Sequence, residues 1–273
     1  EKMDIKRVTS AILGIPLFVI ILTFGNTYIV DIFLAGIALL SMQEYFNAIQ
    51  KECKPIRWLG YLSCLFIAGI HILPNFIPSD MINKSLFLII PILLLISFAQ
   101  IIITNMKTNF KDIVYTVFGI LYIITCVSFL ALIRGMENGI ILVWFAIIAA
   151  WGTDTFAYVI GKRFGKHKFS KVSPKKSIEG CIAGTVGAIL LALIYTIIIN
   201  NTCNLEYSYI AVIGVTILLS IIGQVGDFAA SSIKRYVNVK DYSNLIPGHG
   251  GMLDRIDSLM FLAPFAYVFF TLI

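Results

Sequence analysis

Four aspartates lie within or at the start of apolar segments in the second half of the chain. Asp154 occurs in "WGTDTFAY", Asp227 in "GQVGDF", and Asp254 and Asp257 open the last apolar run. Charged side chains in such segments are costly and usually functional. Asp154 and Asp227 lie ~10 Å from the basic ends of their segments, and i, i+3 spacing puts Asp254 and Asp257 on one helix face. Their similar depth favours a common site; separate ion pairs with nearby basic residues are the alternative.

Basic residues and glycines accompany these carboxylates. In "SPKKSIEG", Lys175, Lys176 and Ser177 come directly before a helix start, where free N–H groups favour an anion. Carboxylates with few Cys or His neighbours suit a hard cation such as Mg²⁺, whereas Lys and Arg suit phosphate oxygens. The combination predicts a metal-bound polyphosphate, and carboxylates reaching into a bilayer suggest a lipid as second substrate. For the basic run 162–171, a solvated face that only sets topology is an equally good interpretation.

Composition places these residues in a membrane protein. Of 273 residues, 59% are hydrophobic and 13% charged, against about 25% charged in soluble domains. Apolar runs near the length of a membrane span recur, which predicts an all-α, polytopic integral membrane helix bundle with about nine transmembrane helices. The expected segments are 8–24, 27–49, 58–77, 85–104, 112–134, 139–161, 180–200, 207–233 and 252–273.

Loop charges predict the orientation. With a cytoplasmic N-terminus, nearly all Lys and Arg fall on the cytoplasmic side, leaving only Lys84 and Arg134 opposite. The C-terminus is then outside, the active site faces the cytoplasm, and the expected location is the inner (cell) membrane. The net charge of +6 is a topology signal, and no basic face for nucleic acid is evident. We expect N-terminal transmembrane helices in 1–135 and a catalytic half in 136–273, with cytoplasmic loops 162–179 and 234–251.

Other polar or small residues in the helices have simpler interpretations. Glu44 and Asp31 are expected to face neighbouring helices or the interface. Gly184 and Gly187 fall at roughly helical spacing and predict close helix packing. The five scattered cysteines show no metal-binding or disulfide pattern.

The stretch from Ser231 to Asp257, "SSIKRYVNVKDYSNLIPGHGGMLDRID", resembles the signature of the phosphatidate cytidylyltransferase (CDP-diacylglycerol synthase) family. The pattern combines Ser-x-apolar-Lys-Arg, a Lys-Asp pair and a Pro-x-His-Gly-Gly-apolar-x-Asp-Arg-apolar-Asp ending. A dozen positions match it: Ser231, Lys234, Arg235, Lys240, Asp241, Pro247, His249, Gly250, Gly251, Asp254, Arg255 and Asp257. The upstream "WGTDTFAYVIGKRFGK" and "SPKKSIEG" also resemble family segments, whereas the N-terminal half matches mainly in hydropathy.

The resemblance implies transfer of CMP from CTP to phosphatidic acid, giving CDP-diacylglycerol and pyrophosphate for phospholipid synthesis. It implies Mg²⁺, with a second cation plausible, and a homodimer in the lipid bilayer. Asp227 and Asp254 are carried over as metal ligands and, with Asp257, as catalytic residues. The expected substrate-binding residues are Asp154, Lys175, Lys176, Ser177, Lys234, Arg235, Lys240, His249 and Arg255.

Three alternatives stay open at this point. A lipid-alcohol kinase would share Mg²⁺ and phosphate handling but lacks the full His-Gly-Gly-x-x-Asp-Arg-x-Asp pattern. A CDP-alcohol phosphotransferase would need an Asp-x-x-Asp-Gly-x-x-Ala-Arg run, which is absent. An ion-coupled transporter would place its charges near the midplane with repeat-related broken helices, and no internal repeat is evident. His249 is as well explained by a turn as by phosphate contact.

Overall fold

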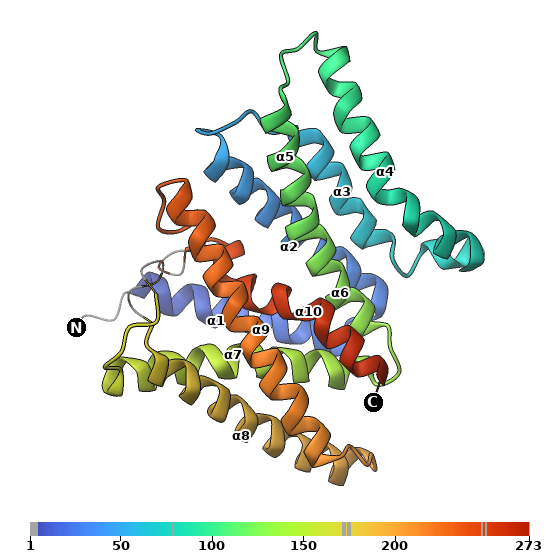
Figure 1. Cartoon of the computed structure of the whole chain (residues 1–273). Coiled ribbons are helices and arrows are strands. Elements are labelled where there is room, and N and C mark those ends of the chain that lie inside the picture. Colours follow the sequence, from blue (N-terminus) through green and yellow to red (C-terminus); the bar gives the residue numbers. More distant parts are fainter. Residues whose placement is uncertain are drawn as a thin grey trace. The chain divides into compact units, whose positions relative to one another are not determined.

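The computed structural model describes residues 5–77, 79–170, 173, 176–246, 248 and 250–272. Across these residues the regular structure is helical, apart from two isolated β-bridges, which confirms the all-α expectation (Figure 1). The α-helices are α1 Ile5–Phe24, α2 Thr27–Ile49, α3 Arg57–Gly69, α4 Ser79–Ile103, α5 Phe110–Gly119, α6 Cys126–Arg134, α7 Gly139–Phe164, α8 Ile178–Cys203, α9 Tyr209–Tyr236 and α10 Leu253–Leu272. A short 3₁₀-helix, η1 Leu73–Asn75, follows α3, and a π-helical turn, η2 Ile120–Thr125, joins α5 to α6.

Every predicted apolar segment contains a helix, but not every helix has the length of a span. Within the described residues, six helices are long and apolar enough to cross a membrane, counting Phe110–Arg134 as one. Helix α3 has 13 residues, about 20 Å at 1.5 Å per residue, which is less than a hydrocarbon core of ~30 Å. The chain is therefore a multi-pass membrane protein, while nine crossings and the orientation of the termini stay predictions.

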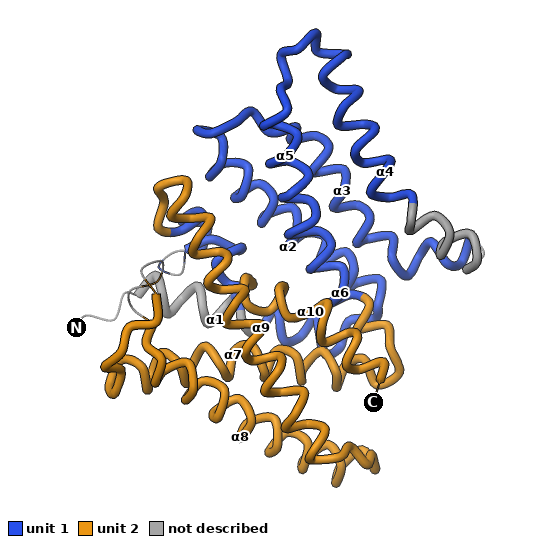
Figure 2. The backbone as a smooth tube through the Cα atoms, viewed as in Figure 1, with its two compact units in different colours: residues 1–131, 241–255 blue, residues 132–240, 256–273 orange. Residues whose placement is uncertain are grey.

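The chain forms two compact units (Figure 2). Unit 1 comprises residues 1–131 and 241–255, and unit 2 comprises residues 132–240 and 256–273. The units do not follow chain order, because the segment 241–255 groups with the N-terminal helices. That the second half of the chain is the catalytic one stays a prediction.

Unit 1 is organised around α2. Tyr45, Phe46 and Met42 of this helix are fully enclosed, and the Tyr45 hydroxyl donates a 3.0 Å hydrogen bond to the Tyr115 carbonyl of α5. Asp31, predicted to face neighbouring helices, is buried and hydrogen-bonded to the His71 ring at 2.8 Å. Both polar groups are therefore satisfied inside the unit, as buried polar groups require.

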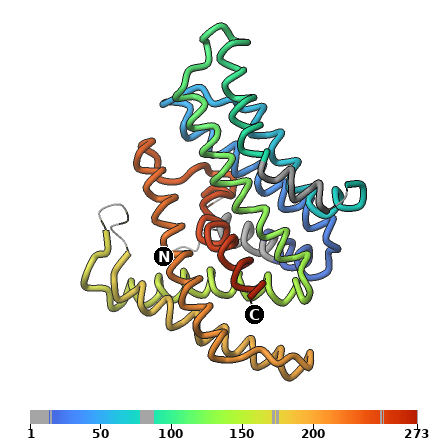
Figure 3. The backbone as a smooth tube through the Cα atoms, turned by 45° about the vertical axis from the view of Figure 1, so that its right-hand side comes forward, coloured from blue at the N-terminus to red at the C-terminus, as the bar shows by residue number. Residues whose placement is uncertain are grey.

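Unit 2 is built on the antiparallel pair α7 and α8, which lie side by side in both views (Figures 1 and 3). A Cβ at Gly184 would lie 2.7 Å from the Thr153 carbonyl oxygen, and one at Gly187 would overlap the Phe156 ring. These contacts confirm the predicted close packing, since only glycine lets the backbones approach so far.

Hydroxyl and amide groups join α9 to this pair. Thr153 donates to the Ser220 hydroxyl at 2.8 Å, Thr185 lies 2.9 Å from the same hydroxyl, and Gln224 donates to Thr185 at 3.2 Å. Such interhelical bonds fix the rotation of apolar helices that would otherwise slide past one another. The bonds therefore fix how α7 and α9 are turned relative to each other, and with this the positions of the acidic residues on these two helices.

Candidate active site

Three predicted carboxylates gather in unit 2, on α7, α9 and α10. The Ser258 hydroxyl of α10 donates a 2.7 Å hydrogen bond to Asp154 of α7. The neighbouring Asp257 is buried and accepts a 2.9 Å hydrogen bond from the backbone N–H of Ser258. The charges that act on Asp257 are those of Asp227, Lys234 and Asp154. The structure thus places these three acids close together, whereas in the sequence only their similar predicted depth in the membrane suggested it.

Lys176 provides the positive charge that meets Asp227. Its ammonium forms an ion pair with the Asp227 carboxylate and lies 4.7 Å from the centroid of the Phe228 ring. Ser231, one turn further along α9, has its hydroxyl 3.5 Å from Asp227. Lys176 is only partly exposed, so its cation is held over the acidic cluster and not free in solvent.

The loop that carries Lys176 is fixed by local contacts. Phe169 stacks on Phe228 with ring centroids 4.7 Å apart, and the N–H of Phe169 donates to the Lys176 carbonyl at 3.1 Å. The ring nitrogen Nδ1 of His167 forms a 2.6 Å hydrogen bond with the carboxylate of Glu179, which lies in the first turn of α8. The loop is therefore held against α9 by an aromatic stack, which positions Lys176.

Ser177 has a structural role in this arrangement. It is the N-cap of α8, with its hydroxyl accepting a 3.1 Å hydrogen bond from the N–H of Gly180. Its side chain is buried, as expected for a cap that satisfies an otherwise unpaired helical N–H. The predicted contact of Ser177 with substrate stays a prediction.

Asp254 organises the glycine-rich loop in unit 1. One of its oxygens accepts hydrogen bonds from the N–H groups of Tyr242, at 2.8 Å, and Gly251, at 3.0 Å. Gly250 has φ of +86°, a left-handed conformation that favours glycine. The Asp254 carboxylate therefore closes the loop 242–251 across its base, and its role as a metal ligand stays a prediction.

Glu44 is the residue that sequence reasoning undervalued. It is buried near the end of α2, and its carboxylate accepts hydrogen bonds from the Ser243 hydroxyl at 2.6 Å and from the N–H groups of Met252 and Leu253 at 2.9 Å. It thus binds the free N–H groups at the start of α10, where a negative charge is favoured. The available signal was a glutamate in an apolar segment, but its partners lie some 200 positions later.

No side-chain hydrogen bond or ion pair ties the other described residues of the predicted set to these two clusters. Arg235, Lys240 and Arg255 are exposed, and Arg235 lies in the last turn of α9, where a cation complements the helix dipole. Lys175 and His249 lie outside the described residues. The gathered set in unit 2 is therefore Asp154, Lys176, Asp227, Lys234 and Asp257.

The donor set suits a hard divalent cation. No three Asp, Glu, His or Cys side chains in the described part of the chain are close enough to form a complete metal cage. Mg²⁺ does not need one, since it is usually held by one or two carboxylates, with waters and substrate phosphates. Asp227 forms an ion pair with Lys176, and its charge also acts on Asp257. The site therefore already combines two carboxylates with a cation. The residues therefore fit Mg²⁺.

The fold and site define a multi-pass helical membrane protein in which clustered carboxylates and lysines can handle an anionic substrate together with a cation. Comparison with known proteins gives the family. The chain matches the cytidylyltransferase family over residues 5–273 and belongs to it. It is thus an enzyme of the nucleotidyltransferase class.

Relatives that bear the name phosphatidate cytidylyltransferase match nearly the whole chain. The phosphatidate cytidylyltransferase of Bacillus subtilis (strain 168) is 31% identical, covering 97% of this chain and 97% of the relative. Those of Staphylococcus haemolyticus and Staphylococcus saprophyticus are 31% and 32% identical, each covering 94% of this chain and 95% of the relative. The resemblance found in the Ser231–Asp257 stretch is thereby confirmed at the level of the family.

Proposed function

We propose that the protein transfers CMP from CTP to phosphatidic acid, forming CDP-diacylglycerol and pyrophosphate in a Mg²⁺-dependent reaction. Family membership over the whole chain and the names of relatives at about 30% identity support this. The observation that carries the proposal in the structure is the Lys176–Asp227 pair beside Asp257 and Asp154, which brings a lysine from the loop before α8 to carboxylates on apolar helices.

The chemistry requires charge management more than proton transfer. A phosphate oxygen of phosphatidate forms a bond to the α-phosphorus of CTP, and the bond from that phosphorus to the oxygen between the α- and β-phosphates breaks, which releases pyrophosphate. The attacking phosphate monoester is already anionic near neutral pH, so no strong base is needed. Two polyanions must instead be held together in line, which makes positioning and electrostatic stabilisation the main contributions.

The residues of unit 2 suit this task. Lys176 and Lys234 would bind phosphate oxygens, with Lys176 already aimed over the acidic cluster by the Phe169–Phe228 stack. Asp227 and Asp257 would hold Mg²⁺, which supplies a Lewis acid that neutralises charge on the transferred phosphoryl group. Asp154 would keep its orientation through the hydrogen bond from Ser258. The role of Asp254 as a metal ligand is implied by the family resemblance alone.

One assay tests the proposal. Purified protein is mixed with radiolabelled CTP and phosphatidic acid vesicles, with Mg²⁺ or with EDTA, and with UTP and ATP as control nucleotides. Lipid-linked CMP with an equal release of pyrophosphate, dependent on Mg²⁺, is expected. Phosphorylated lipid alcohol would favour a kinase instead, and no turnover with any nucleotide would contradict the proposal.

Three features of the setting belong to the same proposal. The active site faces the cytoplasm, where CTP is available, and the enzyme resides in the cell membrane. The excess of Lys and Arg in the loops on one side supports this orientation. A homodimer is also proposed, from the family resemblance alone.

A further inference from the structure

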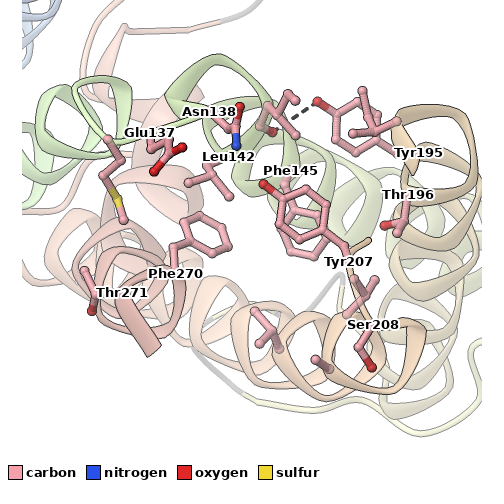
Figure 4. Close-up of a pocket in the computed structure, with 16 residues that line it drawn as sticks. Glu137, Asn138, Leu142, Phe145, Tyr195, Thr196, Tyr207, Ser208, Phe270 and Thr271 are labelled. Atoms are coloured by element: carbon pink, nitrogen blue, oxygen red, sulfur yellow. Dashed lines mark hydrogen bonds between the residues drawn. The ribbon is translucent and has the colours of Figure 1, made fainter. Parts of the chain in front are cut away.

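A second site lies at the far ends of the unit 2 helices, away from the acidic cluster. It is a cavity of about 510 Å³ between the start of α7, the end of α8, the start of α9 and the end of α10 (Figure 4). Leu142, which lines it, precedes Asp154 by about 18 Å along α7 at 1.5 Å per residue. The cavity is thus separate from the proposed site of CMP transfer, and its size is in the range of small-molecule pockets, roughly 300–1,000 Å³.

The walls of the cavity are apolar. Leu142, Phe145 and Phe270 project into it in Figure 4, and Ile199 and Val215 complete the lining. These side chains come from all four helices. Such a surface, in helices that pass through a membrane, fits a hydrocarbon chain.

The polar groups of the cavity offer mainly hydrogen-bond acceptors. The hydroxyl protons of Tyr195, Thr196 and Thr271 are already donated, to the carbonyls of Ile141 at 3.1 Å, Ala192 at 2.8 Å and Val268 at 2.7 Å. Their oxygens can therefore only accept from a ligand. Asn138, Tyr207 and Ser208 also line the cavity and can donate, but no lysine or arginine is among the described lining residues, which distinguishes the cavity from a site built for phosphate.

Charge points in the same direction. Glu137 is the one charged side chain among the lining residues, and it lies at the rim beside Asn138. The charge of Glu137 also acts on the hydroxyl of Tyr207. The backbone of Tyr207 is fixed by two hydrogen bonds to the Asn200 side chain, at 3.0 and 3.1 Å. An anionic head group would meet this carboxylate without a compensating cation from the lining, whereas a cationic one would be attracted.

We infer that this cavity binds a single-chain amphiphile with a cationic, hydrogen-bond-donating head group. The chain lies among Leu142, Phe145 and Phe270, and a primary ammonium meets Glu137 and the hydroxyl oxygens. The ligand class is therefore opposite in charge to phosphatidate and CTP. The inference does not rest on the proposed reaction.

Photoaffinity labelling of the full chain in a non-ionic detergent tests this inference. Three probes of equal chain length carry a diazirine and end in an ammonium, a hydroxyl or a carboxylate, and mass spectrometry locates the adducts. The ammonium probe is expected to label cavity residues roughly threefold more than the hydroxyl probe, as for an exposed ion pair, and the carboxylate probe least. Equal labelling by the ammonium and carboxylate probes would overturn the inference.

Two variants separate the head group from the chain. Glu137→Gln should reduce ammonium labelling to the level of the hydroxyl probe, whereas Glu206→Gln, which removes an exposed carboxylate outside the lining, should leave it unchanged. Ala211→Phe, which fills the cavity, should reduce labelling by all three probes. Equal ammonium labelling of wild type and Glu137→Gln would also overturn the inference, and it can be measured even if Ala211→Phe does not fold.

Discussion

At the scale of single residues, the site is dominated by the cost of holding several carboxylates together. Asp257 is buried and lies within the electrostatic reach of both Asp227 and Asp154, and like charges in such a setting repel. The Lys176 ammonium compensates part of this charge through Asp227. With the charge of Lys234 also acting on Asp257, three carboxylates face two lysines, and this excess of negative charge is suited to a divalent cation.

Replacing Asp227 by Asn tests this argument. The substitution keeps the size of the side chain but removes the charge that Lys176 and the proposed Mg²⁺ share, so turnover of CTP should fall by at least about a hundredfold. Initial rates with saturating phosphatidic acid measure it, at several Mg²⁺ concentrations. Glu52→Gln, which removes a carboxylate paired with Lys111 at 3.3 Å in unit 1, is the control and should retain normal rates. Normal turnover by Asp227→Asn would exclude the carboxylate from catalysis.

Sequence reasoning located several of these residues because their types are anomalous in apolar segments. Asp154, Asp227 and Asp257 are acids where hydrophobic side chains are expected, Lys176 precedes a predicted helix start, and the resemblance added a role for Lys234. Sequence reasoning could not distinguish an N-cap role of Ser177 from a substrate contact, because both roles need a small side chain with a hydroxyl group before a helix. Glu44 has partners far along the chain, so its function could be seen only in the folded structure.

At the scale of elements, the position of α10 depends on its first turn. Asp254 closes the preceding loop, and Glu44 of α2 binds the N–H groups of Met252 and Leu253. Glu44 thus provides an acceptor for N–H groups at the helix start, which have no partner within the helix. Tyr242, Ser243 and Gly251 are thereby held to the helix start inside unit 1.

Substitutions at Glu44 should therefore loosen this loop. Glu44→Ala leaves two backbone N–H groups and the Ser243 hydroxyl without their acceptor, at a cost of about 1–3 kcal/mol for each buried group. Glu44→Gln keeps one acceptor oxygen and should be intermediate. Tryptic cleavage after Lys240 and Arg255 measures the effect, with rates expected in the order Ala, Gln, wild type. Glu52→Ala is the matched control, and equal cleavage of all variants would show that Glu44 does not hold the loop.

At the scale of the whole molecule, the helical class and the segment positions could be predicted because hydropathy and backbone hydrogen bonding leave few choices in a membrane. The number of crossings could not, since α3 is only 13 residues long although its apolar run is longer. The grouping of residues 241–255 with unit 1 was also beyond prediction. It depends on contacts such as Glu44 with Met252, which no local pattern encodes.

The predicted orientation can be tested with the native cysteines. Cys203, at the end of α8, is the exposed one of the five, and the predicted topology places it outside the cell. Cys53, predicted to be cytoplasmic, is buried, and burial raises the pKa of its thiol to about 11. Near neutral pH the Cys53 thiol is therefore protonated and unreactive, since the thiolate is the nucleophile. A membrane-impermeant maleimide should label intact cells at Cys203, and Cys203→Ser should abolish the signal.

Raising the labelling pH provides the internal check. Because the pKa of Cys53 is raised, its reactive fraction increases about tenfold per pH unit below pH 11, whereas burial still limits access. Permeabilised cells labelled at pH 9 should therefore show at most slow additional modification at Cys53. Labelling of Cys203 only after permeabilisation would reverse the orientation. The cluster of Asp154, Asp227 and Asp257, near the other ends of the unit 2 helices, would then lie on the side away from cytoplasmic CTP, so this measurement also bears on the proposed reaction.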